Sequence, residues 1–587
     1  MLTTALVVGG GLLNAADSAR TFCNPMNLDY TWRKGTFRHG ADPVIVLFKD
    51  KYYLFSTWEM AGFRVSDDLL NWASHPFPAT VRPMMTSDDG TYCAAAVAVQ
   101  GDWLYFINMI PRTADRYAAI MRTRDPLSGV WERCGQIKKT KDPALFFDDD
   151  GRAWLYHGLR EPTRVFEIDT RTWTEIPNSE VQLRPAVTSV AEVAGGYERG
   201  RREIFAETDT GALLGGLTNL PCQEAAWMTK HNGRYYLQYA TPGTVSQWYC
   251  DVALEGASPT GPFKLADDSP VSSKVGGFIG SAGHSCVFQD KHGQWWRVTT
   301  MWVGVHDLFE RRLGLFPVHF DKAGRMSTDT VLGDYPRRLE DGAATGWMVQ
   351  SDGRKCVASS SLTNHPPELA ADENVRTWWS AKTGGTSEWL QMDLGKSSQI
   401  HALQVNFAEQ DATAAPAEDY HAYRLLASAD GATWRTLVDK SASRASAPHD
   451  YLPLPQSVAL RYLKVENVHT PCGGKFAIRD LRVFGPGDGS PPALVCGVSI
   501  ERHHDDDRNV TARWNRDANA EGYLVRYGID PGALHQCVQV RGGATEQLTM
   551  HALTRGQKYL WRVDSFNQNG LTQGDIAAES TSGATMK

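Results

Sequence analysis

The chain contains 587 residues, which is too long for one hydrophobic core and predicts roughly three or four domains. Its formal net charge is −7, and its Lys and Arg residues are scattered rather than clustered. The sequence therefore offers no basic stripe for a nucleic-acid backbone and no polybasic membrane patch. After the N-terminus, no run approaches the ~18 apolar residues of a membrane span. We expect neither a nucleic-acid partner nor a membrane span.

Residues 1–20 resemble an export signal, because about a dozen apolar residues are followed by Ala15, Ala16 and Ser18. The segment lacks the basic residues that usually begin such a signal, so an ordinary buried segment or a truncated start stays open. We expect a periplasmic or secreted protein.

The next part of the chain repeats one local pattern five times. Each repeat has a short apolar run, a polar turn and a second run rich in Tyr, Trp and Leu, which predicts a β-hairpin. The repeats are "ADPVIVLFKDKYYLFST" from Ala41, "CAAAVAVQGDWLYFINM" from Cys93, "KDPALFFDDDGRAWLYHG" from Lys141, "QEAAWMTKHNGRYYLQYA" from Gln223 and "GHSCVFQDKHGQWWRVTT" from Gly283. Their spacing is typical of propeller blades. We predict an all-β protein with a five-bladed β-propeller over residues 21–345.

Polar residues precede the first strand of most repeats, where the strands of a propeller converge on the central axis. The equivalent positions are Asp42, an alanine near Ala95, Asp142, Glu224 and His284. Carboxylates that share a small space push their pKa values apart, so one can hold a proton while another stays ionised. Cleavage of a glycosidic bond needs such an acid and such a base. Taken singly, each residue is more simply a turn starter or a cap, but the repeat favours a catalytic site.

The repeats resemble the five-bladed propeller glycosidases of glycoside hydrolase family 43. The likeness rests on "ADPVIVLFKDKYYLF", "VSDDLLNW", "KDPALFFDDDGRAWLYHG", the Glu of "PCQEAAWMTKHNGRYYL", and "AGHSCVFQDKHGQWW" with "RRLGLFPVHFDKAG". It implies that Asp42 is the general base, Asp142 tunes and positions the acid, and Glu224 is the general acid. It places His284 at the channel centre, where the family often holds a metal ion or water, and Arg312 in the substrate pocket. Such enzymes invert configuration, which requires carboxylates about 6.5 to 9.5 Å apart.

Three tryptophans, Trp58, Trp227 and Trp302, are candidates for stacking on a sugar ring, although packing between blades explains each as well. The second repeat reads "CAAAVAV" where the family usually carries a Trp-Ala-Pro-Asp-like run, and Ala-Ala follows Glu224. These departures leave the specificity open. Cysteines near the axis suggest a metal or redox site, but small buried side chains are the favoured interpretation.

Two further β-domains are expected after the propeller. Residues 350–486 resemble the discoidin (F5/8 type C) module, a jelly roll that often binds sugars in bacterial glycosidases, with a purely structural spacer as the alternative. The likeness implies a structural calcium ion near the segment from Asp372 to Thr377, where oxygen ligands suit that ion. Residues 494–587 follow a Gly- and Pro-rich linker and resemble a fibronectin type III domain.

Together these features predict an inverting glycoside hydrolase that removes terminal arabinofuranosyl or xylosyl units from plant or algal polysaccharide side chains. It would act like an α-L-arabinofuranosidase or a β-xylosidase, with no cofactor for the chemistry and with a polysaccharide or oligosaccharide as its partner. Two alternatives stay open, an exo-galactosidase of the same fold and a non-catalytic glycan-binding propeller.

Overall fold

The computed structural model describes residues 20–581, except residues 34, 58–61, 89, 111–112, 114, 160–161, 185–221, 505–506, 508, 551–552 and 554–555. The expected signal segment, apart from its last residue, and Trp58 lie outside the described residues. Within the described part, strands dominate, and the one α-helix is the single turn α2 (Arg82–Met85). No described helix has the length and apolar character needed to cross a membrane. The predicted all-β class is confirmed.

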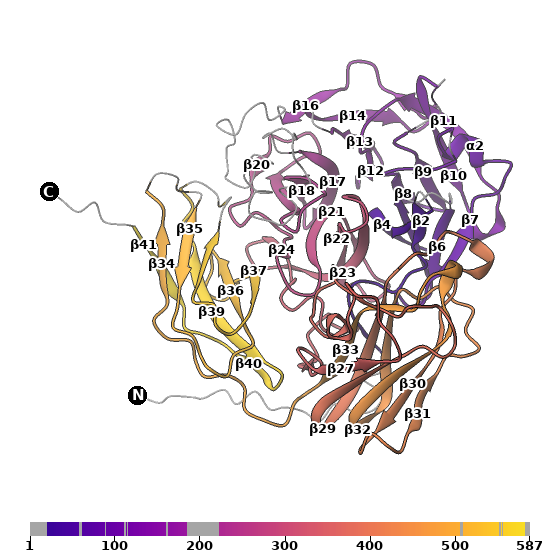
Figure 1. Cartoon of the computed structure of the whole chain (residues 1–587). Coiled ribbons are helices and arrows are strands. Elements are labelled where there is room, and N and C mark those ends of the chain that lie inside the picture. Colours follow the sequence, from indigo (N-terminus) through magenta and orange to yellow (C-terminus); the bar gives the residue numbers. More distant parts are fainter. Residues whose placement is uncertain are drawn as a thin grey trace.

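Five antiparallel sheets form the propeller (Figure 1). The first two blades are β4 (Ala41–Phe48), β5 (Lys51–Thr57), β6 (Gly62–Ser66) and β7 (Ala73–Pro76), then β8 (Ala96–Gln100), β9 (Trp103–Ile107), β10 (Tyr117–Thr123) and β11 (Glu132–Lys138). The third blade is β12 (Ala144–Phe147), β13 (Ala153–His157), β14 (Thr163–Asp169), β15 (Thr174–Glu175) and β16 (Val181–Arg184). The last two are β17 (Glu224–His231), β18 (Arg234–Thr241), β19 (Cys250–Gly256) and β20 (Lys264–Leu265), then β21 (Gly280–Gln289), β22 (Trp295–Trp302), β23 (Arg311–Phe320) and β24 (Met326–Thr328).

All five hairpins predicted from the repeats are present, as the first two strands of each blade. The sequence pattern predicts Asp50 and Lys51 as the turn of the first hairpin, but the turn lies one residue earlier. Phe48 pairs with Lys51, and the two residues between them, Lys49 and Asp50, both have positive φ. That geometry is the two-residue turn whose twist matches antiparallel strands.

The first strands of neighbouring blades contact one another around a closed ring, in which β21 of the last blade packs against β4 of the first. Outside the ring, β1 (Thr21–Phe22) pairs with β25 (Arg337–Arg338). The N-terminal segment is thus hydrogen-bonded to the segment that follows the last blade. A short hairpin, β2 (Thr31–Arg33) and β3 (Phe37–His39), leads directly into β4. Apolar side chains from the first, second and last blades share one core cluster. The start of β4 is therefore fixed by the hairpin that precedes it and by the last blade, which packs against it.

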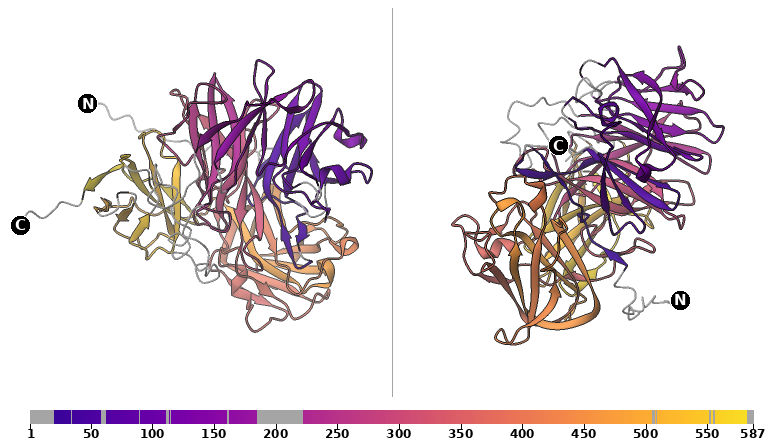
Figure 2. Two further views of the ribbon diagram at one scale, coloured as in Figure 1. Left: turned by 90° about the horizontal axis from the view of Figure 1, so that it is seen from above. Right: turned by 90° about the vertical axis from the view of Figure 1, so that its right-hand side faces the viewer.

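Two β-sandwiches follow and lie beside the propeller (Figures 1 and 2). The first contains β26 (Met348–Val349), β27 (Lys355–Ala358), β28 (Trp379–Ser380), β29 (Trp389–Phe407), β30 (Ala422–Ser428), β31 (Arg435–Asp439), β32 (His449–His469) and β33 (Ala477–Gly485). The second contains β34 (Ser499–Arg502), β35 (Val510–Arg513), β36 (Gly522–Gly528), β37 (Gln536–Arg541), β38 (Gln547–Met550), β39 (Leu560–Asn567), β40 (Gly570–Thr572) and β41 (Ala577–Thr581). Each has its own apolar core.

A buried ionic network joins the first sandwich to the propeller. Glu310 of the propeller accepts a hydrogen bond from Arg479 of the sandwich at 2.9 Å, and both side chains are fully buried. Arg479 also contacts Glu409 at 3.2 Å, and Arg38 of β3 contacts the same carboxylate. Burial opposes the charge of Glu310, but Arg479 and its other partners hold its pKa well below the usual range. Removing one partner of such a network leaves an uncompensated buried charge, so the two domains form one structural unit.

Candidate active site

One residue at the inner end of each blade has a left-handed backbone. The five are Asp42 (φ 52°), Ala94 (φ 41°), Asp142 (φ 45°), Ala225 (φ 62°) and His284 (φ 48°). This conformation costs an L-amino acid about 1–2 kcal/mol, so its recurrence at five equivalent places shows that the fold imposes it. In the first, fourth and fifth blades the strand register also shifts there. The bulge interrupts the alternation of the strand and re-aims side chains at the axis.

This equivalence corrects the alignment made from the sequence. The equivalent residue of the second blade is Ala94 rather than Ala95, and that of the fourth blade is Ala225. Glu224 stands one position earlier, at the first residue of β17. The fourth blade thus contributes its carboxylate from a different backbone position than the first and third blades do.

Three side chains that can donate hydrogen bonds surround the carboxylate of Asp42. Its Oδ2 accepts a hydrogen bond from Thr57 Oγ1 at 2.5 Å, and its Oδ1 lies 3.1 Å from His284 Nδ1 and 3.4 Å from Arg311 NH1. Burial alone would raise the pKa of this carboxyl, but His284, Arg311 and the Thr57 hydrogen bond outweigh it and lower the pKa to about 2. Asp42 is therefore ionised at neutral pH, as a general base must be.

Asp142 has the opposite environment. Its side chain is buried and accepts one hydrogen bond, from the backbone N–H of Ala225 at 3.1 Å. Burial is the largest cause of its shift, and the nearby charges of Glu224 and Asp42 add to it, against the opposing charge of His284. Together they raise the pKa of Asp142 to about 7. Two carboxyls of one site thus hold different protonation states near neutral pH.

Glu224 is held by two side chains of its own blade. Tyr249 donates its hydroxyl hydrogen bond to Glu224 Oε1 at 2.7 Å, and the Cys222 thiol lies 3.3 Å from Oε2. Tyr249 is fully buried, and burial with the neighbouring Glu224 charge raises its pKa well above the ordinary value. The tyrosine therefore keeps its proton and fixes the orientation of the glutamate.

His284 lies among the three carboxylates. Its backbone N–H donates to Asp251 Oδ1 at 3.0 Å, and its ring pairs with Asp42. Burial lowers the pKa of His284, but the charges of Asp42, Asp142 and Glu224 outweigh burial and raise it. The neighbouring carboxylates thus favour the protonated imidazole, whose charge balances part of the acidic cluster.

Neither metal prediction gains a ligand set from the described residues, among which no group of three or more His, Cys, Asp or Glu side chains is placed to hold an ion. In the first predicted site, the Nδ1 atom of His284 faces Asp42 Oδ1 at 3.1 Å. In the second predicted site, Thr377 Oγ1 donates to Asp372 Oδ2 at 2.7 Å, and burial raises the pKa of Asp372 to about 6. A metal at His284 and calcium near Asp372 stay predictions.

The arginine that faces the axis is Arg311. It reaches Asp42 and donates to Thr244 Oγ1 at 2.8 Å. Successive residues of a strand point to opposite faces, so the next residue, Arg312, points away into the domain interface, where its Nε donates to His449 Nε2 at 2.8 Å. Arg312 is fully buried there. The structure thus corrects the expectation that Arg312 reaches the substrate pocket, and Arg311 takes its place.

Trp302 and Trp227, the two described tryptophans among the three candidates, both lie against neighbouring side chains of the propeller. Trp302 is 4% exposed, and its Nε1 donates to the carbonyl of Leu308 at 2.9 Å. Trp227 is half-buried and packs against the cores of several blades. These positions fit the alternative of inter-blade packing, and stacking on a sugar stays a prediction for both.

The cysteines near the axis bear on the choice between a metal or redox site and small buried side chains. No disulfide joins the described cysteines. Cys93 lies 4.0 Å from Asp42 Oδ2, and burial together with that carboxylate raises the pKa of its thiol to about 12. A protonated thiol is a poor metal ligand and a poor nucleophile, which supports the view of Cys93 as a small buried side chain.

Sequence reasoning missed Arg311, Thr57, Tyr249 and Thr244. The Arg-Arg pair at the start of a predicted strand was a signal for Arg311, but deciding which of the two faces the axis requires the strand register. Thr57 ends the second strand of the first hairpin, opposite Ala41, and this pairing could have suggested it. Tyr249 and Thr244 come from segments with no distinguishing pattern.

Replacing Asp142 by Asn should make the protein's stability less dependent on pH. The folded state holds the Asp142 proton up to about pH 7, whereas a carboxyl in the unfolded chain releases it near pH 3.8. Stability of the wild type therefore falls as pH rises through this window, by up to about 1.4 kcal/mol for each pH unit. The Asn variant lacks this loss. We expect its melting temperature, relative to wild type, to be higher at pH 8 than at pH 4.5. If the melting temperatures of the wild type and the variant changed with pH in the same way over that range, Asp142 would not be a buried, protonated carboxyl.

Comparisons with known proteins match two parts of the chain. A model described as glycosyl hydrolases family 43 matches residues 37–324, and one described as F5/8 type C domain matches residues 355–481. The xylosidase/arabinosidase of Bacteroides ovatus is 30% identical over 259 residues, covering 38% of this chain and 75% of that protein.

Two more relatives are matched over a smaller share of their length. Xylosidase/arabinosidase 43A of Humicola insolens is 29% identical over 203 residues, covering 32% of this chain and 58% of that protein. The xylan 1,3-beta-xylosidase of a Vibrio species is 26% identical over 275 residues, covering 43% of this chain and 46% of that protein. The chain thus spans about half the length of these two relatives.

Proposed function

We propose, from the premise that this chain belongs to glycosyl hydrolases family 43, that it is an inverting glycosidase which removes terminal arabinofuranosyl or xylosyl units. The observation that carries the proposal is the contrast between two carboxyls at one axis. Asp42 is ionised with a pKa of about 2, while Asp142 holds a proton up to about pH 7. A site with both states can supply a base and sustain an acid near neutral pH.

In this proposal Asp42 accepts a proton from a water molecule as that water attacks the anomeric carbon. Glu224, from the opposite side of the axial site, donates a proton to the leaving oxygen of the glycosidic bond. Asp142 orders the start of the fourth blade through its bond to Ala225, the residue next to Glu224. The charges of His284 and Arg311 keep Asp42 ionised between turnovers.

The substrate assignment rests on the relatives. Their names describe activity on xylosides and arabinosides, which supports a pentose at the chain end of a plant or algal polysaccharide. The F5/8 type C domain supports an enzyme that acts on polymers, and we propose a fibronectin type III-like spacer for the third domain. We further propose that the enzyme is exported, because its natural substrates are extracellular.

The stereochemical course tests the mechanism. If a water attacks in line while Glu224 assists departure, the released sugar has the inverted anomeric configuration. Proton NMR of the first-formed product, recorded before mutarotation on aryl arabinofuranosides and xylosides, reads this out. A retained configuration, or transfer of the sugar to an added alcohol, would contradict the roles of Asp42 as base and Glu224 as acid. Release of galactose alone would instead overturn the pentose assignment.

A further inference from the structure

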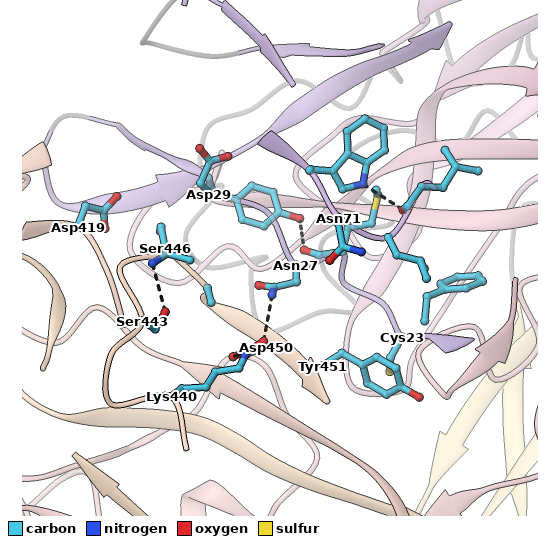
Figure 3. A pocket seen from close by; sticks show the side chains of 18 of the residues that line it. Cys23, Asn27, Asp29, Asn71, Asp419, Lys440, Ser443, Ser446, Asp450 and Tyr451 are labelled. Atoms are coloured by element: carbon cyan, nitrogen blue, oxygen red, sulfur yellow. Dashed lines mark hydrogen bonds and ion pairs between the residues drawn. The ribbon is translucent and has the colours of Figure 1, made fainter. Parts of the chain in front are cut away.

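A cavity of about 710 Å³ lies between the first blade and the first sandwich, away from the axial site (Figure 3). One side is formed by the N-terminal segment 21–32 and by the turn 69–72 of the first blade. The other side is formed by residues 440–447 and the start of β32. We call this cavity the interdomain groove. Its volume is within the ~300–1,000 Å³ of small-molecule sites.

The charges of the interdomain groove are nearly balanced, with one cation in excess. Three carboxylates line it, and each is already paired with a cation. The pairs are Asp29 with Arg64 at 2.7 Å, Asp450 with Lys440 at 2.6 Å, and Asp419 with Arg38. The remaining lining cation, Arg444, lies 4.7 Å above the ring of Tyr420. The one surplus charge, on Arg444, is exposed and screened by solvent, so the groove attracts free ions only weakly and the ligand it suits is neutral.

Three residues that line the groove carry buried polar atoms without a partner among the described residues. They are Asn27 Oδ1, Thr31 Oγ1 and Trp32 Nε1. Thr31 and Trp32 are 5% and 8% exposed. Asn27 uses its amide N–H to bond Asp450 at 3.2 Å, so the carbonyl oxygen remains an acceptor (Figure 3). An unpaired buried polar atom costs about 1–3 kcal/mol. A ligand with several hydroxyls, each both donor and acceptor, can satisfy this mixed set.

The groove also offers an aromatic surface. Trp72 lines its first-blade side and is half-buried. Its Nε1 is committed to the carbonyl of Leu69 at 3.0 Å, which fixes the ring. A rigid ring edged by polar groups suits a ligand with an apolar face and a polar rim.

We propose that the interdomain groove is a second glycan site, which binds a neutral oligosaccharide segment of the polymer that the axial site hydrolyses. The proposal rests on the proposed function for the identity of that polymer. A nearly balanced charge, mixed partners for hydroxyls and a fixed aromatic side chain are features of a sugar-binding site, and the groove combines them.

Arg38 connects the wall of the groove to the strand that leads to the axial site. Arg38 contacts Asp419 and donates to Ser446 at 2.7 Å, both in the groove wall. Asp42 is four residues further along the chain, a distance of at most about 14 Å between the two α-carbons. Binding in the groove would therefore raise the local concentration of chain ends at the axis.

The test uses the full chain with Asp42→Asn, so that bound polymer is not hydrolysed. Calorimetric titration with soluble arabinoxylan and with soluble arabinan gives Kd. Trp72→Ala removes the aromatic face, and Ala445→Trp fills the groove from an exposed position without deleting an internal contact. Trp434→Ala, in the same sandwich but outside the groove, is the matched control. We expect both groove variants to raise Kd at least about 10-fold, and the control to leave Kd within about twofold of the parent.

The outcomes separate the groove from the catalytic proposal. An unchanged Kd in folded Ala445→Trp overturns the groove as a glycan site, even if the enzyme hydrolyses aryl glycosides normally. Tighter binding of polygalacturonate than of the neutral polymers, weakened by salt, overturns the assignment of a neutral ligand. Conversely, a wild type that hydrolyses no aryl glycoside refutes the proposed function, while Kd values that still depend on Trp72 and Ala445 support the groove.

Discussion

Asp42→Asn should lower kcat by at least about 10²-fold and leave the fold intact. The amide has the shape of the carboxylate and can still accept the hydrogen bond from Thr57. Asparagine also tolerates the left-handed backbone that Asp42 adopts. It cannot take a proton from water at any accessible pH, so the base is lost while the geometry remains. Steady-state kinetics on an aryl pentoside, with circular dichroism for the fold, measures both.

The control for this prediction is Asp102→Asn. This control makes the same Asp-to-Asn change at an exposed position, since Asp102 lies in the hairpin turn of the second blade. It should keep wild-type kcat. If Asp42→Asn turned over like the wild type, the base would have to be sought among the other axial carboxyls. A loss confined to KM would mean that Asp42 binds the sugar and does not activate water.

Glu224→Gln should reduce turnover according to how much help the leaving group needs. For natural oligosaccharides, whose leaving oxygen must be protonated, we expect kcat to fall at least about 10²-fold. For a nitrophenyl glycoside, whose phenolate leaves without a proton, the loss should be much smaller. Glutamine still accepts the hydrogen bond from Tyr249, so the orientation of the side chain is preserved. The measurement is kcat on a series of aryl glycosides of graded leaving-group pKa, compared between variant and wild type.

Tyr249→Phe is the matched variant for Glu224. It removes one hydrogen bond to the glutamate and keeps the carboxyl, so it should lower kcat far less than Glu224→Gln and without the steep dependence on the leaving group. Equal losses of Glu224→Gln on every leaving group would rule out general acid catalysis by this residue.

Much of the fold followed from short-range pattern. Each blade hairpin is coded by apolar runs and a turn within about twenty residues, and all five were predicted. The carboxylates Asp42, Asp142 and Glu224 were found because the repeat fixes where each blade meets the axis. The sequence did not give the exact register within each repeat. The first turn lies at Lys49 and Asp50, and in the fourth blade the left-handed residue is Ala225, one position after Glu224.

Other features depend on contacts between segments far apart in sequence. Whether Arg311 or Arg312 faces Asp42 depends on the pairing of β23 with β22, since a shift of one residue exchanges the two faces. The burial of Arg312 depends on His449, 137 positions away, which only the docked sandwich brings near. The sequence of Trp302 allows both sugar stacking and packing between blades, and its 4% exposure, which arises from long-range contacts, fits packing.

The sequence by itself determined that this protein is a propeller with three axial carboxylates followed by β-domains, because a repeated local pattern places equivalent residues at equivalent points. Only the tertiary structure decided the protonation states and the second cavity. The low pKa of Asp42 and the raised pKa of Asp142 arise from neighbours on other blades and from burial. The interdomain groove exists because residues 21–32 and 440–447 meet across two domains. Local patterns encode strands, but electrostatic fields and cavities are sums over atoms that only the folded chain brings together.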